Sequence, residues 1–286
     1  MGALTADSPR LDEQLERLPA LENLPPFPLV ALRVLSVLSG TDSSLKEICD
    51  LIRADPVFAA EILRTANSPL VAFSKEITSV LQASMLLGFR RLRRLVTTVG
   101  LRSYMDKSFT RALQACWRHS VASAMIAERI ARWNSIDRDF AYTAGILHDV
   151  GRVALANINP QIYAELVDRM TAAPWCDVLR SERDSFGIDH CCAGRLLVMK
   201  WGLPEEFIEI TSRHHEPLTH REDATEVVRL SCGLADALGF AAVAHSSICT
   251  FDEALAKFPE SVRKHFPGNK ELASEIANEI SVIEAA

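Results

Sequence analysis

Seven polar side chains in the middle of the chain are of the types that bind divalent metal ions. Five are histidines and two are aspartates, and each lies within helical, largely apolar sequence. Imidazole and carboxylate groups buried in such sequence are costly unless they are paired or bound to a metal. In chain order they are His119, His148, Asp149, His190, His214, His215 and Asp236.

Imidazole combined with carboxylate suits divalent first-row metals such as Fe, Mn, Co, Ni or Zn. Seven groups are more than one tetrahedral ion needs. They fit a pair of ions about 3.5–4 Å apart that activates a water molecule. The alternative is hydrogen-bonded packing without metal, which for any single histidine is the favoured interpretation.

Other nucleophilic chemistry has little support. Ser120 adjoins His119, but neighbouring positions on a helix do not face each other. The sequence contains no GxSxG motif and no glycine-rich phosphate loop. Cys191 and Cys192, beside His190, are interpreted as small buried apolar residues rather than as redox or metal groups.

A second candidate feature is a basic cluster on one helix. It fits a phosphate, nucleic-acid or acidic-partner contact, but a solvated helix face paired with some of the 37 acidic residues is the favoured interpretation. No aromatic residue interleaves with it, so stacking on single-stranded nucleic acid is not indicated. The cluster comprises Arg90, Arg91, Arg93, Arg94 and Arg102.

The elements that must position these groups are helices. Ala31, Val34, Leu35 and Leu38 share one helical face. A helix after Ser44 is predicted to begin with a capping box, and another to start at Pro56 behind an Asp55 cap. Further predicted helices run through VLQASMLLG, after Thr78 or Ser79, and through FRRLRRLVTTVGLRSY.

Composition sets the class and the compartment. The 286 residues are 48% hydrophobic and 24% charged, with a net charge of −6, which is typical of a globular protein and disfavours a nucleic-acid binder. Seven cysteines, an odd number without CxxC spacing, indicate reduced thiols. With no signal core and no apolar stretch long enough for a membrane span, we expect a cytoplasmic location.

The predicted organisation is a lead-in segment, two helical layers and a tail. No glycine- or serine-rich linker separates the layers, so they form either one unit or two docked ones. Leu272, Ile276, Ile280 and Ile283 share a face of the tail, which suits packing on the body or on a partner. The divisions fall at residues 1–20, 21–110, 111–240 and 241–286.

The chain resembles the HDOD family, the HD-related output domains of bacterial signalling proteins, over about residues 21–240. The resemblance implies an all-α fold in which an HD-like helical bundle packs with a smaller N-terminal helical subdomain. It also implies a regulatory role, often beside receiver domains of response regulators or other signalling domains. It rests on LPPFPLVALRVLSVL, LIRADPVFAAEILRTANSP, WRHS, AGILHDVGR, FGIDHCCAGRLLVMKWGLP and HHEP.

The second layer is also similar to the HD-GYP cyclic dinucleotide phosphodiesterases. Their two-metal ligand set carries over onto all seven candidate residues. Three features depart from that family: Ala115 stands where some of those enzymes place a third-metal glutamate, Arg152 replaces their lysine, and the DGxGYP continuation is absent. A guanidinium is a planar fork rather than a compact ammonium.

We therefore expect an HDOD-type signalling module with two divalent metal ions, acting through a signalling protein partner or a nucleotide or phosphate ligand, without a membrane. The alternative is a metal-dependent phosphohydrolase, in which the seven candidate residues bind the ions and Arg152 stabilises phosphate charge as a catalytic residue. A third alternative is a structural scaffold without metal.

Overall fold

A computed structural model describes most of the chain. Every regular element in the described residues is an α-helix and no strand occurs there, so the predicted all-α class is confirmed. None of these helices is long and apolar enough to cross a membrane. The predicted lead-in, residues 1–20, lies outside the described residues, which are 28–39, 44–67, 77–105, 111–173, 177–216, 223–243 and 248–285.

The first helices match the sequence pattern, with one exception at a cap. Asp55 accepts a hydrogen bond from the Phe58 backbone at 3.0 Å, as predicted for the start of the third helix. Ser44 is an N-cap whose side chain makes no capping hydrogen bond, so the predicted capping box is wrong. These helices are α3 (Leu29–Ser39), α4 (Leu45–Arg53) and α5 (Pro56–Ala66).

Helix α6 (Val80–Met105) joins these helices to the rest of the molecule. It packs against α3, α4 and α5 on one side and against α8 on the other. Gly88, with φ 69° and ψ 169°, breaks its helical geometry. This conformation favours glycine, and it divides the element into the two helical segments that the sequence predicts.

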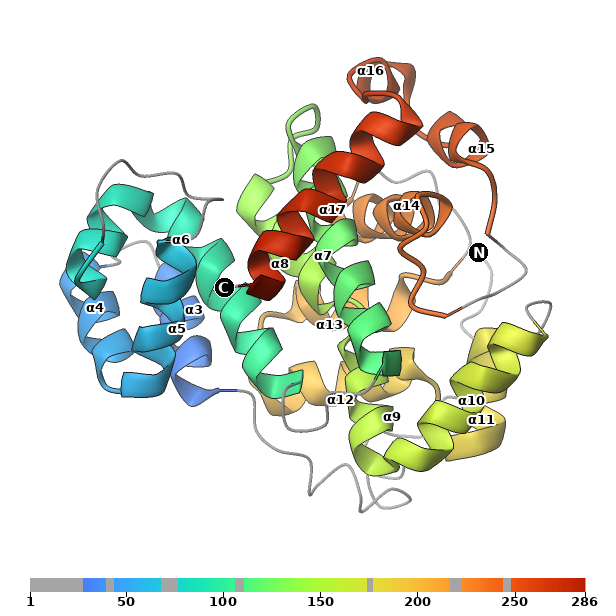
Figure 1. Ribbon diagram of the computed structural model, residues 1–286, viewed down its shortest axis with the longest axis horizontal. Coiled ribbons are helices and arrows are strands. Elements are labelled where there is room, and N and C mark those ends of the chain that lie inside the picture. The colour runs from blue at the N-terminus through green and yellow to red at the C-terminus, as the bar shows by residue number, and fades with distance from the viewer. Residues whose placement is uncertain are drawn as a thin grey trace, which may run out of the picture.

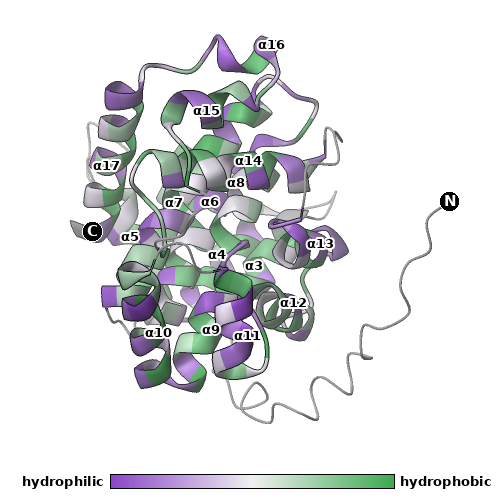
Figure 2. Ribbon diagram, turned by 90° about the vertical axis from the view of Figure 1, so that its right-hand side faces the viewer, coloured by the Kyte–Doolittle hydropathy of each residue, from purple (hydrophilic) through white to green (hydrophobic). Residues whose placement is uncertain are grey.

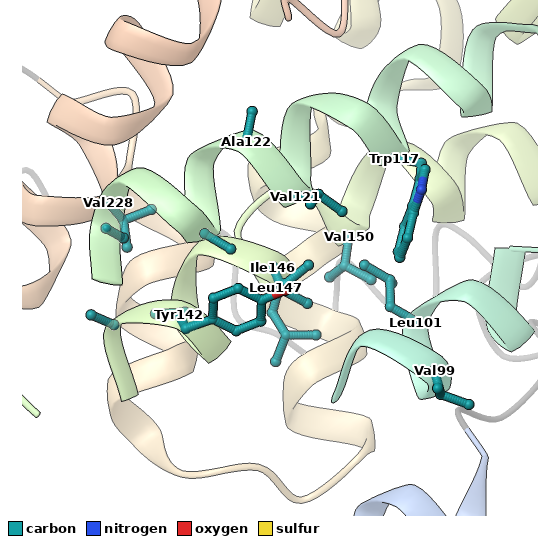
Figure 3. Packing of buried hydrophobic residues seen from close by; sticks show 14 of the residues in the cluster. Val99, Leu101, Trp117, Val121, Ala122, Tyr142, Ile146, Leu147, Val150 and Val228 are labelled. Atoms are coloured by element: carbon teal, nitrogen blue, oxygen red, sulfur yellow. The ribbon is translucent and has the colours of Figure 1, made fainter. Parts of the chain in front are cut away.

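The remaining helices form the bundle that carries the candidate site. Helix α7 packs on α8 and α14, and α12 packs on α9 and α13. Figure 3 shows Trp117, Val121, Tyr142, Ile146 and Val150 meeting in the apolar interior. The bundle helices are α7 (Arg111–Ala131), α8 (Arg138–Leu147), α9 (Val150–Ile158), α10 (Pro160–Ala172), α11 (Val178–Phe186), α12 (His190–Lys200), α13 (Glu205–Arg213) and α14 (Ala224–Ala237).

The tail consists of α15 (Phe251–Ala256), α16 (Glu260–Arg263) and α17 (Asn269–Ala285). Helix α17 runs across α7 (Figure 1), and the four apolar residues predicted to share its face are buried. Arg102 of α6 donates hydrogen bonds to the carbonyl oxygens of Ile283 and Glu284, near the end of α17. The tail therefore packs on the body of the same chain.

One main apolar core connects the first helices, the bundle and the tail. The main cluster of buried hydrophobic side chains is continuous from Ala31 in α3 to Ile283 in α17. Hydrophilic and hydrophobic residues alternate along α10, α11, α13 and α17 in Figure 2, as expected for helices with one buried face. The two layers therefore share a core, although α3, α4 and α5 lie to one side of the bundle (Figure 1).

Candidate metal centre

Most of the candidate ligands lie where helices begin or end. His148 is the C-cap of α8 and Asp149 the N-cap of α9, with φ −100° and ψ 13° at the aspartate. The chain changes direction between them, so these adjacent side chains converge on one interior point, which they would not do within a continuous helix. His190 opens α12 and His214 caps the end of α13.

A glycine crossing brings α9 and α12 together. A Cβ atom at Gly151 would lie 1.8 Å from the His190 carbonyl oxygen and 2.6 Å from the Gly194 nitrogen. No larger residue fits between these backbones. The absence of a side chain at this position therefore allows His190 to approach Asp149.

Four imidazoles meet in two pairs around one carboxylate. The Nε2 atoms of His119 and His148 are 3.2 Å apart, and those of His190 and His214 are 3.3 Å apart. Asp149 lies between the pairs. Its Oδ1 is 3.2 Å from His190 Nε2 and 3.3 Å from His214 Nε2, whereas its Oδ2 is 3.7 Å from His119 Nε2.

In three of these histidines the other ring nitrogen, Nδ1, contacts a backbone carbonyl oxygen. His148 Nδ1–H donates to the Gly145 carbonyl at 2.7 Å, and His214 Nδ1–H to that of Thr211 at 3.1 Å. His119 Nδ1 is 3.0 Å from the Phe240 carbonyl. A carbonyl oxygen only accepts, so Nδ1 of each of these rings carries a proton, and in a neutral ring Nε2 then holds the lone pair.

The spacing within each histidine pair matches that of two ligands on one metal ion. Two nitrogen ligands of one tetrahedral ion, each about 2.0–2.1 Å from it, are about 3.3 Å apart. Although burial acts to lower the pKa of His119, Cys232 and Asp236 raise it well above its ordinary value, so in the absence of an ion its Nε2–H can be donated to His148 Nε2 at 3.2 Å. Burial lowers the pKa of His148 to about 3, so this imidazole stays neutral and able to bind a cation.

A ring of charged groups supports the carboxylate. Arg152 donates from Nε to Asp149 Oδ2 at 2.8 Å and from Nη1 to Glu182 Oε1 at 2.9 Å. Glu182 Oε2 accepts from the backbone and Nδ1 of His190, at 2.9 and 2.6 Å. Although burial acts to raise the pKa of Asp149, Arg152 and the adjacent histidines hold it well below its ordinary value.

Glu182 is a site residue that sequence reasoning missed. It lies in the polar helix VLRSERDSF, where nothing distinguishes it from the exposed charges around it. In the structure it is fully buried, and burial raises its pKa to about 7 against the lowering effect of Arg152. Only the three-dimensional pairing with Arg152 and His190 identifies it.

His215 and Asp236 occupy the margins of the cluster. His215 is exposed, and its ring centroid is 4.4 Å from that of His214 and 4.9 Å from that of His190. Asp236 Oδ1 is 3.1 Å from Nδ1 of His119, on the side of that ring away from the other histidines. The structure brings both residues to the site, and their roles as ligands stay predictions.

Two buried cysteines also reach the cluster. Cys232 Sγ is 3.4 Å from His119 Nε2, and Cys191 Sγ is 3.7 Å from His190 Nε2. Burial raises the pKa of both thiols, which disfavours the thiolate in the absence of a cation. The sequence alone predicts no site role for Cys232.

Three groups of side chains have the geometry to hold an ion within the described residues. In each group, one donor atom per residue lies within 4.8 Å of the others. Two of these groups share His148, and two share His214, so they are parts of one connected cluster. The groups are His119, His148 and Cys232; His148, Asp149 and His214; and His190, Cys191, His214 and His215.

Comparison with known proteins assigns the family. Residues 24–217 match the model of the HDOD domain. This is most of the chain, and the protein belongs to the HDOD domain family. An uncharacterized protein from Treponema pallidum (strain Nichols) is 24% identical over 206 residues, covering 70% of this chain. The matched region is 39% of that relative's length.

Solved structures share the fold. An HDOD domain protein of unknown function from Geobacter sulfurreducens is 25% identical, with a TM-score of 0.75 and coverage of 97% of this chain and 96% of that one. A protein from Shewanella amazonensis SB2B, provisionally described as a phosphohydrolase, is 21% identical with a TM-score of 0.68, covering 93% and 94% of the two chains. At that identity the second likeness supports the fold alone.

Proposed function

We propose that the chain is a bacterial signal-transduction module whose bundle holds two divalent first-row metal ions. It would act mainly by binding a protein partner or a ligand rather than by catalysis. The facing Nε2 atoms of the two histidine pairs carry this proposal. His119 and His148 would hold one ion, His190 and His214 the other, with Asp149 between them. His215 and Asp236 would complete the set. Such ions would supply Lewis acidity and a strong positive field to the bundle interior.

Burial supports binding rather than turnover. The side chains of His148 and His190 are 0% exposed and that of Asp149 is 1% exposed. Arg152 is also buried, and its guanidinium already donates to two carboxylates. A phosphate ester would have to displace these contacts to reach either group. A centre enclosed in this way is suited to fixing the arrangement of the helices.

The proposed output is contact with a signalling protein in the cytoplasm. The N-terminal subdomain, residues 21–110, would form a surface beside the HD-like bundle of residues 111–240, and the shared core would transmit a change in one to the other. The cysteines of the described residues are free, in agreement with a reducing compartment.

A metal-dependent phosphohydrolase is the second candidate because the donor set is of a kind that two-metal hydrolases use. In that function Arg152 would move from its present carboxylates to stabilise phosphate charge. Exposed His215 marks the edge of the cluster from which a substrate would approach.

Metal content and turnover separate the candidates. The purified full chain is analysed by plasma mass spectrometry and assayed with cyclic dinucleotides and a generic phosphodiester. We expect two ions per chain and no turnover. His148→Ala should lose metal, whereas His265→Ala, which changes an exposed histidine stacked on Trp133, should retain it.

Two results would contradict the proposed binding role. Turnover that His148→Ala abolishes and His265→Ala preserves would replace the binding role with the hydrolase. The second is a chain that contains no transition metal after growth with each candidate metal and whose stability does not change with a chelator. That result would favour the structural scaffold without metal.

A further inference from the structure

A second polar feature lies outside the histidine cluster, between α6, α7, α8 and α17. A cavity of about 390 Å³ opens here, and six arginines but only three carboxylates line it, an excess of three positive charges. The carboxylates belong to Glu128, Asp139 and Glu279. The arginines are Arg90, Arg91, Arg94, Arg129, Arg132 and Arg138.

Two of these six arginines form no ion pair with a carboxylate in the described residues. Glu128 accepts from Arg94 at 3.0 Å and from Arg138 at 2.7 Å, and Arg94 also donates to Glu279. Asp139 pairs with Arg90, and Arg129 with Glu275 outside the lining. Within the part of the chain that the structure describes, Arg91 and Arg132 form no ion pair. Both are exposed, so a ligand can reach their guanidinium groups.

An apolar cavity of about 270 Å³ adjoins the charged one and shares Arg91, Arg94 and Glu279 with it. Its other lining residues are aliphatic or carry hydroxyl groups, with Tyr142 the only aromatic among them. The Arg94 guanidinium carbon lies 4.4 Å from the Tyr142 ring centroid, and the Tyr142 hydroxyl is 3.1 Å from that of Thr98. Tyr142 is itself buried under Arg94, so the wall open to a ligand consists of the planar Arg94 guanidinium and aliphatic side chains, which suits a flat heterocycle.

We propose that these joined cavities bind a nucleotide, with its phosphates in the arginine-lined part and its base in the apolar part. Guanidinium groups bind phosphate oxygens in bidentate fashion, and the charged cavity alone has the volume of a small-molecule site. The net charge of −6 and the concave shape favour a small ligand over a long nucleic acid.

This site is separate from the proposed metal centre. None of the seven candidate ligands lines either cavity. Glu128 follows His119 by nine residues on α7, about 13 Å along the helix axis. Helix α17, which supplies one wall, lies beyond residues 24–217 that match the family model. The site therefore does not depend on the metal-binding function.

The test measures binding by calorimetry to the full chain, with ATP and GTP as probes and pyrophosphate as the phosphate-only control. The double variant Arg91→Ala, Arg132→Ala removes the two guanidinium groups that form no ion pair in the described residues. Arg180→Ala, a 78% exposed arginine on α11, is the matched control. We expect the double variant to weaken triphosphate binding at least tenfold for each lost arginine, and the control to leave it unchanged. Pyrophosphate should bind at least tenfold more weakly than the triphosphates.

Three results would overturn the assignment: no binding of either triphosphate, binding that the double variant does not weaken, or equal binding of pyrophosphate and triphosphates. Binding to duplex DNA in place of the triphosphates would also overturn it, in favour of a nucleic-acid surface. His148→Ala should retain nucleotide binding, which separates this result from the fate of the metal centre. Both altered arginines are exposed, and matching thermal unfolding curves will show that the variants are folded.

Discussion

The histidine cluster and the arginine-lined cavity are both polar regions among packed helices, but they are built differently. In the cluster short side chains at helix ends are held by backbone carbonyls and buried carboxylates. In the cavity long arginine side chains from several helices reach across an open seam, and several of them share their carboxylate partners. In the first arrangement a second hydrogen bond on each ring restricts the position of its donor atom. The second lets charges rearrange around a ligand.

The largest expected effect is at the glycine crossing. Gly151→Ala places a methyl group 1.8 Å from the His190 carbonyl, so α9 and α12 must separate. We expect a loss of at least about 3 kcal/mol of stability and of metal binding, measured by chemical denaturation and metal analysis. Gly233→Ala, on α14 with nothing within 4 Å of the added carbon, should be neutral or stabilising by up to about 1 kcal/mol. Equal effects of the two changes would mean that this crossing does not position the cluster.

Much of the fold and part of the candidate metal centre could be predicted from the sequence. Apolar periodicity predicts the helices and the buried face of α17, and the histidine and aspartate types indicate a buried cluster. The convergence of His148 and Asp149 depends on a change of helix direction between adjacent residues, which periodicity does not reveal. Glu182 was missed because a buried charge and a surface charge have the same sequence context. The absent capping box at Ser44 shows that a motif permits a hydrogen bond without requiring it.

Glu182 gives the next largest effect. Glu182→Gln keeps the shape of the side chain but removes the charge that Arg152 and His190 share. We expect metal affinity to fall about 10–100-fold, as for other groups that orient metal ligands, and stability to fall by about 1–3 kcal/mol. Competition with a chelating dye measures the affinity.

The matched control is Glu209→Gln, which changes a half-exposed glutamate paired with Arg213. An exposed pair of this kind contributes under about 1 kcal/mol, so neither stability nor metal affinity should change appreciably. Wild-type metal affinity in Glu182→Gln would show that the buried carboxylate does not orient His190 for binding.

The smallest effect tests whether charges in the arginine-lined cavity do rearrange. Glu279→Gln releases Arg94 from its partner on α17 while Glu128 still holds it. We expect a stability change below about 1 kcal/mol, since the pair is partly exposed, and severalfold tighter binding of ATP, measured by calorimetry. Glu284→Gln, on the same helix, loosens the pair with Arg118, which does not line the cavity, and should leave ATP affinity unchanged. If Glu279→Gln instead weakened ATP binding, the carboxylate would be part of the recognition rather than a competitor for Arg94. The cavity would then be as rigidly specified as the histidine cluster.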